Sequence, residues 1–306
     1  MATLQGQNFR VCVPGSTTGT YKVIAMSTSC TITQVNNTED MTTKDDVGLA
    51  SKPVTTSKSW SVSVDSLDVT DAAAMLTAIK AMQPMTLFWS ETSTTDNQTW
   101  GADNIYPRRG QAFLSDGTFT FDNRTNSAKQ LQFQGTGKID YETLPEETLD
   151  PVSAGSYTKG QFVRLFLSSD NTAAPAAVIG AALTLQLHVS VSLEDVTTKD
   201  TEGEWQVQEP TAISYDITTG ALVRSGETIV SAVGAKAYSD LESIYNNGTP
   251  VKWKIANVRS DNNRTAASTI ASGSATLTQL ELTAANRQKA EYKATMQGFG
   301  TYTVGS

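Results

Sequence analysis

The sequence predicts a mainly β protein with two tandem homologous β-sandwich (partly closed barrel) domains, each with one flanking α-helix. Segments of alternating apolar and polar residues recur along the chain, and Ser and Thr make up about a quarter of it, a composition that suits strands and turns. The tetrapeptide TTKD also occurs twice, at Thr42–Asp45 and Thr197–Asp200, in similar surroundings. A repeat of this length is domain-sized, so each copy should hold its own core.

The similarity between the two halves continues on both sides of the tetrapeptides. The aligned pairs are GQNFRVCV at Gly6 with GQFVRLFL at Gly160, Cys30 with Leu185, Trp60 with Tyr215, Leu67 with Leu222, Pro84 with Pro250, DNQT at Asp96 with NNRT at Asn262, GTFTF at Gly117 with GSATL at Gly273, and QGTG at Gln134 with QGFG at Gln297. The 155-residue spacing of the tetrapeptides recurs in three of these pairs. We therefore interpret the chain as a tandem duplication.

The boundary between the copies is expected at ETLPEETLDPVSAGS, where two prolines and several acidic and small residues interrupt any apolar period. Such a composition is typical of a linker. The expected organisation is copy one over residues 1–141, the linker over residues 142–156 and copy two over residues 157–306.

In copy one, a strand should lead into the helix. Trp60, Val62 and Val64 alternate with polar residues, which is the pattern of a strand with one wet face. Thr70 is the expected N-cap of a helix that presents apolar side chains at helical spacing and ends at Pro84.

In copy two, the equivalent helix is expected from about Glu227 to Tyr245, and it should be the longer of the two. The sequence Asn246-Asn247-Gly248 is a suitable C-cap. A strand should follow each helix, over Met85–Ser90 and Val251–Ile255. Both copies should then close with a β-hairpin, over residues 119–137 and 277–300, because turn-forming residues separate two alternating arms there.

The charge of the chain argues against tight binding of nucleic acid. Its net charge is −8, whereas proteins that bind nucleic acid tightly concentrate Lys and Arg where the phosphates lie. No run of eighteen apolar residues and no apolar leader is present, so we expect no membrane span and no export. Cys12 and Cys30 align with Phe166 and Leu185, which favours buried thiols over a disulfide.

The chain lacks the residue patterns of a catalytic site. His188 is its one histidine, so the chain lacks the further histidines that a histidine-based acid/base pair or metal site would need. No nucleophile elbow, zinc-protease, P-loop or dinucleotide motif is present. We expect no catalytic residue, no cofactor and no metal, and we interpret His188 as a plain surface or interface residue on the polar face of a strand.

The closing hairpins resemble the C-terminal hairpin of phage major tail tube proteins: an alternating strand, a short turn, a second alternating strand, then QGTG or QGFG. The stretch from Cys30 to Leu67 is also similar to that family, with a TKD-type loop before a Trp-containing strand. These segments cover most of each copy. Copy two departs from the family pattern, since it has EWQVQEPTAISYDI where a serine-rich Trp strand would stand.

The resemblance implies two-sheet sandwich domains that assemble into rings, stacked as a hollow tube in the virion tail. DNA would pass through the lumen without sequence-specific binding. It further implies the chain itself, a tape-measure protein and tail initiator and terminator proteins as partners, with assembly in the host bacterial cytoplasm. Because each chain supplies two similar domains, three chains should close a pseudo-hexameric, homotrimeric ring.

By the same resemblance, the loops around the two tetrapeptides would contact the neighbouring ring. The expected ring-stacking residues are Thr42, Thr43, Lys44, Asp45, Asp46, Thr197, Thr198, Lys199 and Asp200. Two alternatives stay open: the inner tube protein of a contractile tail or injection system, and a β-rich adhesin or pilin-like module. An enzyme is disfavoured by the missing catalytic constellation.

Overall fold

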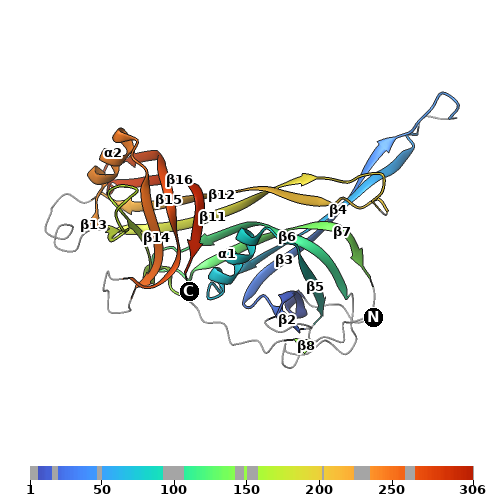
Figure 1. Cartoon of the computed structure of the whole chain (residues 1–306), viewed down its shortest axis with the longest axis horizontal. Helices are drawn as coiled ribbons and strands as arrows, with labels where there is room; N and C mark the ends of the chain where they lie inside the picture. Colours follow the sequence, from blue (N-terminus) through green and yellow to red (C-terminus); the bar gives the residue numbers. More distant parts are fainter. Residues whose placement is uncertain are drawn as a thin grey trace.

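The computed structural model describes residues 6–15, 20–46, 50–91, 107–141, 148–149, 158–201, 203–223, 235–258 and 266–305. Strands dominate them and two α-helices accompany the strands (Figure 1), so the mainly β fold class is confirmed. The strands form one hydrogen-bonded network that runs from β13 to β8 without closing on itself. Neither described helix is long and apolar enough to cross a membrane.

The elements of the first half begin with a short 3-10 helix. They are η1 (Gly6–Asn8), β1 (Phe9–Pro14), β2 (Thr20–Val23), β3 (Ser27–Asp40), β4 (Pro53–Ser66), α1 (Ala72–Ala81), β5 (Met85–Glu91), β6 (Arg108–Thr120), β7 (Ala128–Asp140) and β8 (Thr148–Leu149). Strand β8 lies within the expected linker and pairs in parallel with β2. The rest of that linker, residues 142–147 and 150–156, lies outside the described residues, as do the aligned DNQT and NNRT segments.

The second half repeats the same order. Its elements are η2 (Gly160–Phe162), β9 (Val163–Leu167), β10 (Ala177–Ile179), β11 (Ala182–Asp195), β12 (Gln208–Leu222), β13 (Ala235–Lys236), α2 (Tyr238–Asn247), β14 (Val251–Val258), β15 (Ala266–Thr283) and β16 (Glu291–Val304). The antiparallel ladder β2-β1-β5-β6-β7-β4-β3 of the first half has the counterpart β10-β9-β14-β15-β16-β12-β11. Pairing and order therefore match strand for strand.

An aromatic ring over two glycines marks the same place in each core. In the first half, a Cβ on Gly135 would lie 2.2 Å from the Trp60 ring, and one on Gly110 would lie 2.4 Å from it. In the second half, Tyr215 lies over Gly298, where a Cβ would come within 1.9 Å of the ring. Only glycine leaves room for these rings against the neighbouring strands. The expected correspondence of Trp60 with Tyr215 is consistent with this geometry.

These glycines correct one part of the alignment. Gly110 in β6 and Gly273 in β15 both face the aromatic side chain, and they lie 163 residues apart, like Gly135 and Gly298. The expected match of GTFTF at Gly117 with GSATL at Gly273 is therefore wrong by seven residues. Gly117 instead faces the side chain of Ile79. Two short Gly-Thr/Ser motifs look alike in sequence, but the ring above the glycine determines which of them correspond.

The helix starts also differ from the expectation. Asp71, not Thr70, is the N-cap of α1, because the Thr70 hydroxyl donates to the Asp68 carboxylate at 2.6 Å in the preceding turn. The expected start near Glu227 lies outside the described residues; α2 begins at Tyr238, after strand β13, and has ten residues, as α1 does, so it is not the longer helix. Its start is fixed by the Asp240 carboxylate, which accepts a hydrogen bond from the Ala237 amide at 2.8 Å. The expected end is confirmed, with Gly248 as C-cap at φ 59°.

Candidate assembly interfaces

The two halves are joined by strand pairing, in a contact that we call the internal joint. Residues Asp116–Thr120 of β6 pair antiparallel with Gln186–Ser190 of β11. The other end of the same β6 edge, Arg108–Ala112, pairs with β5. The sheet of the first half thus continues directly into the sheet of the second half (Figure 1).

On its polar face, the internal joint holds the chain's one histidine. His188 Nε2 lies 2.6 Å from a carboxylate oxygen of Asp116 in the first half, and Nδ1 lies 2.8 Å from one of Asp216 in β12. Partial burial opposes protonation of the ring, but hydrogen bonds and charge from both carboxylates outweigh it and raise the pKa of His188. The expected surface or interface residue is therefore found at the interface between the halves.

On its apolar face, the joint is fully buried. Phe119 and Leu187, which lie opposite each other in the ladder, are 0% and 1% exposed. Helix α1 packs against the second half as well, and the Tyr302 hydroxyl of β16 donates to the Leu76 carbonyl of α1 at 2.7 Å. Most of the buried apolar residues of both halves belong to one continuous cluster, and each half has a smaller cluster of its own beside it.

The β6–β7 turn of the first half extends the ladder onto the start of the second half. The amide of Phe121 donates to the Leu185 carbonyl at 2.7 Å, and the Gly160 amide donates to the Thr125 carbonyl at 3.0 Å. A Cβ on Gly160 would lie 2.3 Å from the Asp122 carbonyl oxygen. Gly160 therefore has to be glycine for the turn to approach this closely.

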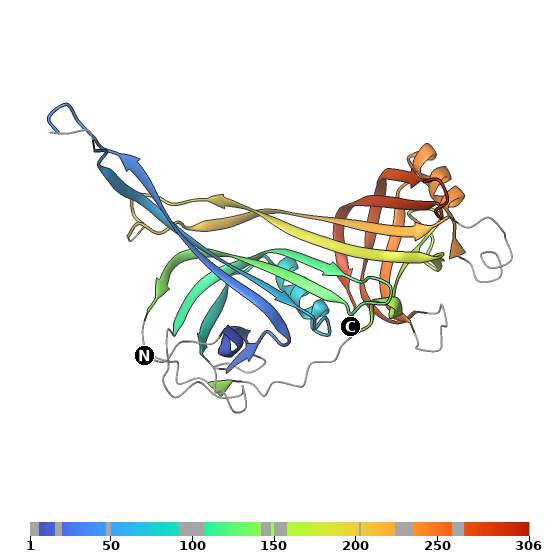
Figure 2. The ribbon, with the colours of Figure 1, turned by 180° about the vertical axis from the view of Figure 1, so that it is seen from behind.

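Two long hairpins project from the sheets, the first arm (β3–β4) and the second arm (β11–β12). The second arm lies across the first half: the Lys58 amide donates to Glu204 O at 2.5 Å, and the Gly137 amide donates to Gln206 O at 2.8 Å. An ion pair of 2.7 Å between Lys58 and Glu204 side chains lies at the same crossing. The first arm instead extends beyond the rest of the chain (Figures 1 and 2).

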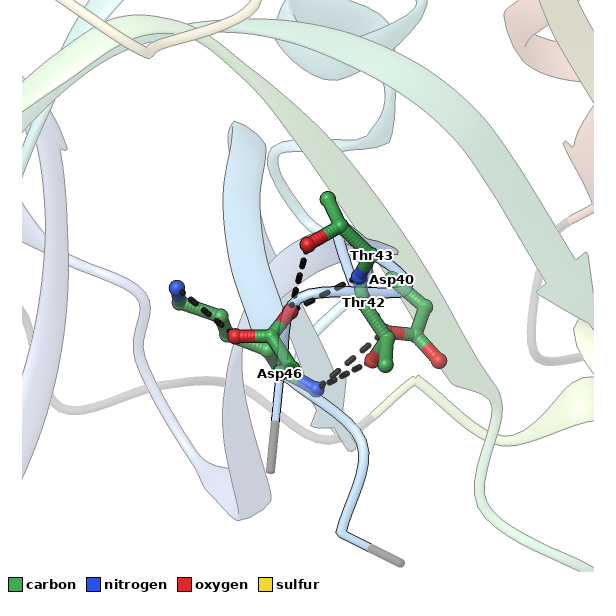
Figure 3. A network of polar contacts seen from close by, with 5 residues as sticks. Asp40, Thr42, Thr43 and Asp46 are labelled. Carbon is green, nitrogen blue, oxygen red and sulfur yellow. Dashed lines mark hydrogen bonds and ion pairs between the residues drawn. The ribbon is translucent and has the colours of Figure 1, made fainter. Parts of the chain in front are cut away.

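The tip of the first arm is the first TTKD segment, and its threonines form the turn (Figure 3). The Asp40 carboxylate accepts from the Thr42 amide at 2.9 Å and from the Thr42 hydroxyl. The Asp46 carboxylate accepts from the Thr43 amide at 2.7 Å and lies 3.4 Å from Lys52 Nζ. These hydrogen bonds lower the pKa of Asp40 and Asp46.

The tip of the second arm repeats this construction at a spacing of 155 residues. The Asp195 carboxylate accepts from the Thr197 amide at 3.0 Å, and the Thr197 hydroxyl accepts from the Val207 amide at 2.9 Å. The Thr198 amide donates to the Thr201 hydroxyl at 3.0 Å. The recurring tetrapeptide thus encodes a turn in both arms.

The nine expected ring-stacking residues accordingly occupy two separate tips. Within those tips, Lys44, Asp45, Lys199 and Asp200 present exposed side chains, while the threonines are used in the turn. The internal joint itself was not predicted, because strand pairing between halves leaves no local signal in the sequence.

The described residues contain no cluster of three or more His, Cys, Asp or Glu side chains placed to hold a metal. Both cysteines are free thiols, with Cys12 buried and Cys30 half-buried. Burial raises the pKa of each, which keeps the thiol in its unreactive protonated form.

Fold and joint together define a structural β protein that extends its sheet by pairing one module with the next. Residues 160–304, from η2 through β16, match the family of phage tail tube proteins. The second half of the chain accordingly matches phage tail tube proteins, a structural and non-enzymatic family. No curated protein matches the chain.

Solved structures of tails are similar to part of the chain. The tail of an empty gene transfer agent particle, refined with C6 symmetry, is 14% identical with a TM-score of 0.36, and the match covers 48% of this chain and 98% of that one. The virion of a native gene transfer agent particle gives 15% identity and a TM-score of 0.34 over the same shares. The SPP1 tail tube gives 16% identity and a TM-score of 0.36, covering 48% of this chain and 77% of that one.

Proposed function

We propose that three copies of this chain close into a pseudo-hexameric ring and that such rings stack into the tail tube. The observation that carries this proposal is the matching strand ladder of the two halves, together with their edge-to-edge joint. A module that pairs with its neighbour by the same edges generates a closed ring when the rotation closes. Six modules then correspond to three chains, each a tandem duplication.

The tube would carry DNA through its lumen in the virion tail. The net charge of −8 supports passage without tight binding, since an acidic wall repels phosphate where a basic wall would hold it. Tape-measure, initiator and terminator proteins would act on the ends and the length of the tube. Assembly would take place in the host bacterial cytoplasm.

The arm tips are the proposed contacts between successive rings. The tips occur once per module, and their turns hold the side chains of Lys44, Asp45, Lys199 and Asp200 exposed. Because both tips are built alike, a ring would present six similar contacts at three-fold symmetry. The two kinds of tip would alternate around it.

Electron microscopy of the purified chain tests the ring. The expected result is tubes or single rings whose class averages show six lobes with three-fold symmetry, and a ring mass equal to three chains. A ring of six chains would overturn the trimer, and a chain that stays monomeric at all concentrations and salt conditions would overturn the ring.

A further inference from the structure

The internal joint uses a different surface on each half, and each half carries the counterpart of both surfaces. The first half contributes the end of β6 and the following turn, and the second half contributes the edge of β11, Gly160 and the second arm. The counterpart of each surface, on the other half, is therefore not used in the internal joint. The leftover edge on the first half belongs to β3, and the leftover strand end on the second half belongs to β15.

The matching ladders give the residues of these leftover surfaces. Asp116–Thr120 of β6 correspond to Gln279–Thr283 of β15 at the 163-residue spacing, and Gln186–Ser190 of β11 correspond to Thr31–Val35 of β3 at 155 residues. Among the described residues, β3 pairs only with β4, and Gln279–Thr283 pair only with β16. Each of the two surfaces has an open strand edge, which is a template for pairing with another chain.

We infer that β3 of one copy pairs antiparallel with the end of β15 of a second copy, with Ile32 opposite Leu282 and Thr33 opposite Glu281. This inference rests on the proposed ring and specifies the contact between its chains. The partner is a second copy, because the chain already contains this joint once between its own halves. The register is that of Leu187 with Phe119 and of His188 with Thr118.

Exposure of apolar side chains supports this pairing. Leu282 is 49% exposed, whereas its counterpart Phe119 is 0% exposed in the internal joint. Ile32 is partly buried, whereas its counterpart Leu187 is 1% exposed. Pairing would remove Ile32 and Leu282 from water together, and the burial of apolar surface favours association.

Gly6 supports the pairing of β3 with β15 independently, because no contact within the single chain requires glycine at this position. Gly6 corresponds to Gly160, and Gly160 is needed because the turn at Asp122 passes over it. In the single chain, a Cβ on Gly6 would meet nothing within 4 Å. The counterpart of Asp122 is Ala285, in the β15–β16 turn. The turn of a second copy would lie over Gly6 and require glycine there.

The first arm offers a third line of support. The second arm crosses the first half at Gly137, which has φ 73°, and the counterpart Gly300 has φ 68°. Phe299 beside it is 44% exposed. Beyond its crossing with the second arm at Lys58, the first arm extends past the rest of the chain (Figure 2). The first arm of a neighbouring copy would cover Phe299 as the second arm covers Thr136.

Disulfide trapping tests the register. In a Cys30→Ser background, Thr33→Cys with Glu281→Cys places two thiols at directly opposed positions, where the Cα separation of an antiparallel pair of about 4.5–5.5 Å suits a disulfide. Oxidation should give covalent dimers and trimers that disappear on reduction. The matched control, Gln34→Cys with Glu281→Cys, points the two side chains to opposite faces and should stay monomeric under denaturing electrophoresis.

The outcomes separate this contact from the proposed ring. Three-fold rings that form by microscopy while Thr33→Cys with Glu281→Cys stays uncrosslinked, or crosslinks no more than the control, overturn the β3–β15 register and leave the ring intact. Absence of any ring from the unsubstituted chain overturns the proposed function.

A second variant tests the contact without a cysteine. Gly6→Val should leave the melting temperature of the single chain unchanged, since the site is open, and should abolish ring formation. Gly160→Val should lower the melting temperature instead, because the same clash then lies within the chain. Rings that form normally from Gly6→Val would overturn the inferred contact of Gly6 with the β15–β16 turn of the neighbouring copy.

Discussion

His188 Nε2 lies 2.6 Å from Asp116 Oδ2, and this contact links the two halves of the chain. The counterpart positions in the inferred contact between copies are Thr33 and Gln279, which carry no charge. The joint inside the chain and the joint inferred between copies therefore differ at this contact. The joint inside the chain has a charge-assisted bridge here, and the inferred joint has no charged group at these two positions.

Stability of the internal joint should depend on pH through His188. Its pKa is raised in the folded chain, so the contribution is complete below the unfolded pKa of about 6.5 and is lost as pH rises through the folded pKa. His188→Gln should lower the free energy of unfolding at pH 6 by on the order of 0.2–1 kcal/mol, as for partly exposed ion pairs. The deficit should shrink at pH 9, as measured by urea denaturation.

Ser190→Ala is the control for this measurement. Ser190 lies at the end of the same ladder, with its hydroxyl 2.9 Å from that of Ser214, and neither group titrates in this range. Its effect should be the same at both pH values. A His188→Gln deficit that is equally constant would contradict the charged bridge.

Gly135 should tolerate no side chain. A Cβ there would lie 2.2 Å from the Trp60 ring, so Gly135→Ala should destabilise the chain by about 1–3 kcal/mol through overpacking. Gly298→Ala should behave alike beneath Tyr215. Thermal unfolding measures both.

Gly6→Ala is the matched control for these glycines, since its Cβ has open space and should change stability by less than about 0.5 kcal/mol. The double variant Gly135→Ala with Trp60→Leu should recover part of the loss relative to the sum of the single changes. Strict additivity of the two changes would argue against a clash with the ring.

The ion pair of Lys129 with Asp71 should be sensitive to the loss of one partner. The Lys129 side chain is 0% exposed and that of Asp71 is 10% exposed. Asp71→Asn leaves a buried, unpaired ammonium, which should cost about 3–5 kcal/mol. Chemical denaturation of the variant measures this.

The same pair should be replaceable as a whole. The second half has Tyr292 and Ala237 at the counterpart positions, so the fold accepts a neutral solution there. Lys129→Met with Asp71→Ala should therefore be less destabilising than Asp71→Asn alone. A double variant as unstable as the single one would show that the pair has a further role.

The sequence predicted most of the fold because the repeat carries local signals. TTKD encodes a turn through Asp40 and Thr42, and the strand that contains Trp60 shows its alternation directly. The two closing hairpins followed from their turn residues and alternating arms. Such signals depend on neighbours in the chain, and a single sequence displays them.

The internal joint was outside the reach of those signals. Pairing of Asp116 with Ser190 joins residues 74 positions apart, and no sequence pattern near either residue indicates this pairing. The misaligned Gly117 has the same cause, since the aromatic ring that selects Gly110 comes from β4, a strand that is distant in sequence. His188 could be placed on a polar face but not between two aspartates.

The arm tips should control how rings stack without controlling how they close. Lys44→Glu with Lys199→Glu reverses exposed charges and leaves the Asp40–Thr42 and Asp195–Thr197 turns intact. Tubes should become shorter or dissociate into rings of unchanged diameter, and added salt should reduce the difference because it screens surface charge. Electron micrographs at low and high salt give the length distributions. Lys22→Glu, an exposed charge on β2, is the control and should leave tube length unchanged; equal lengths for all three proteins would exclude the tips from stacking.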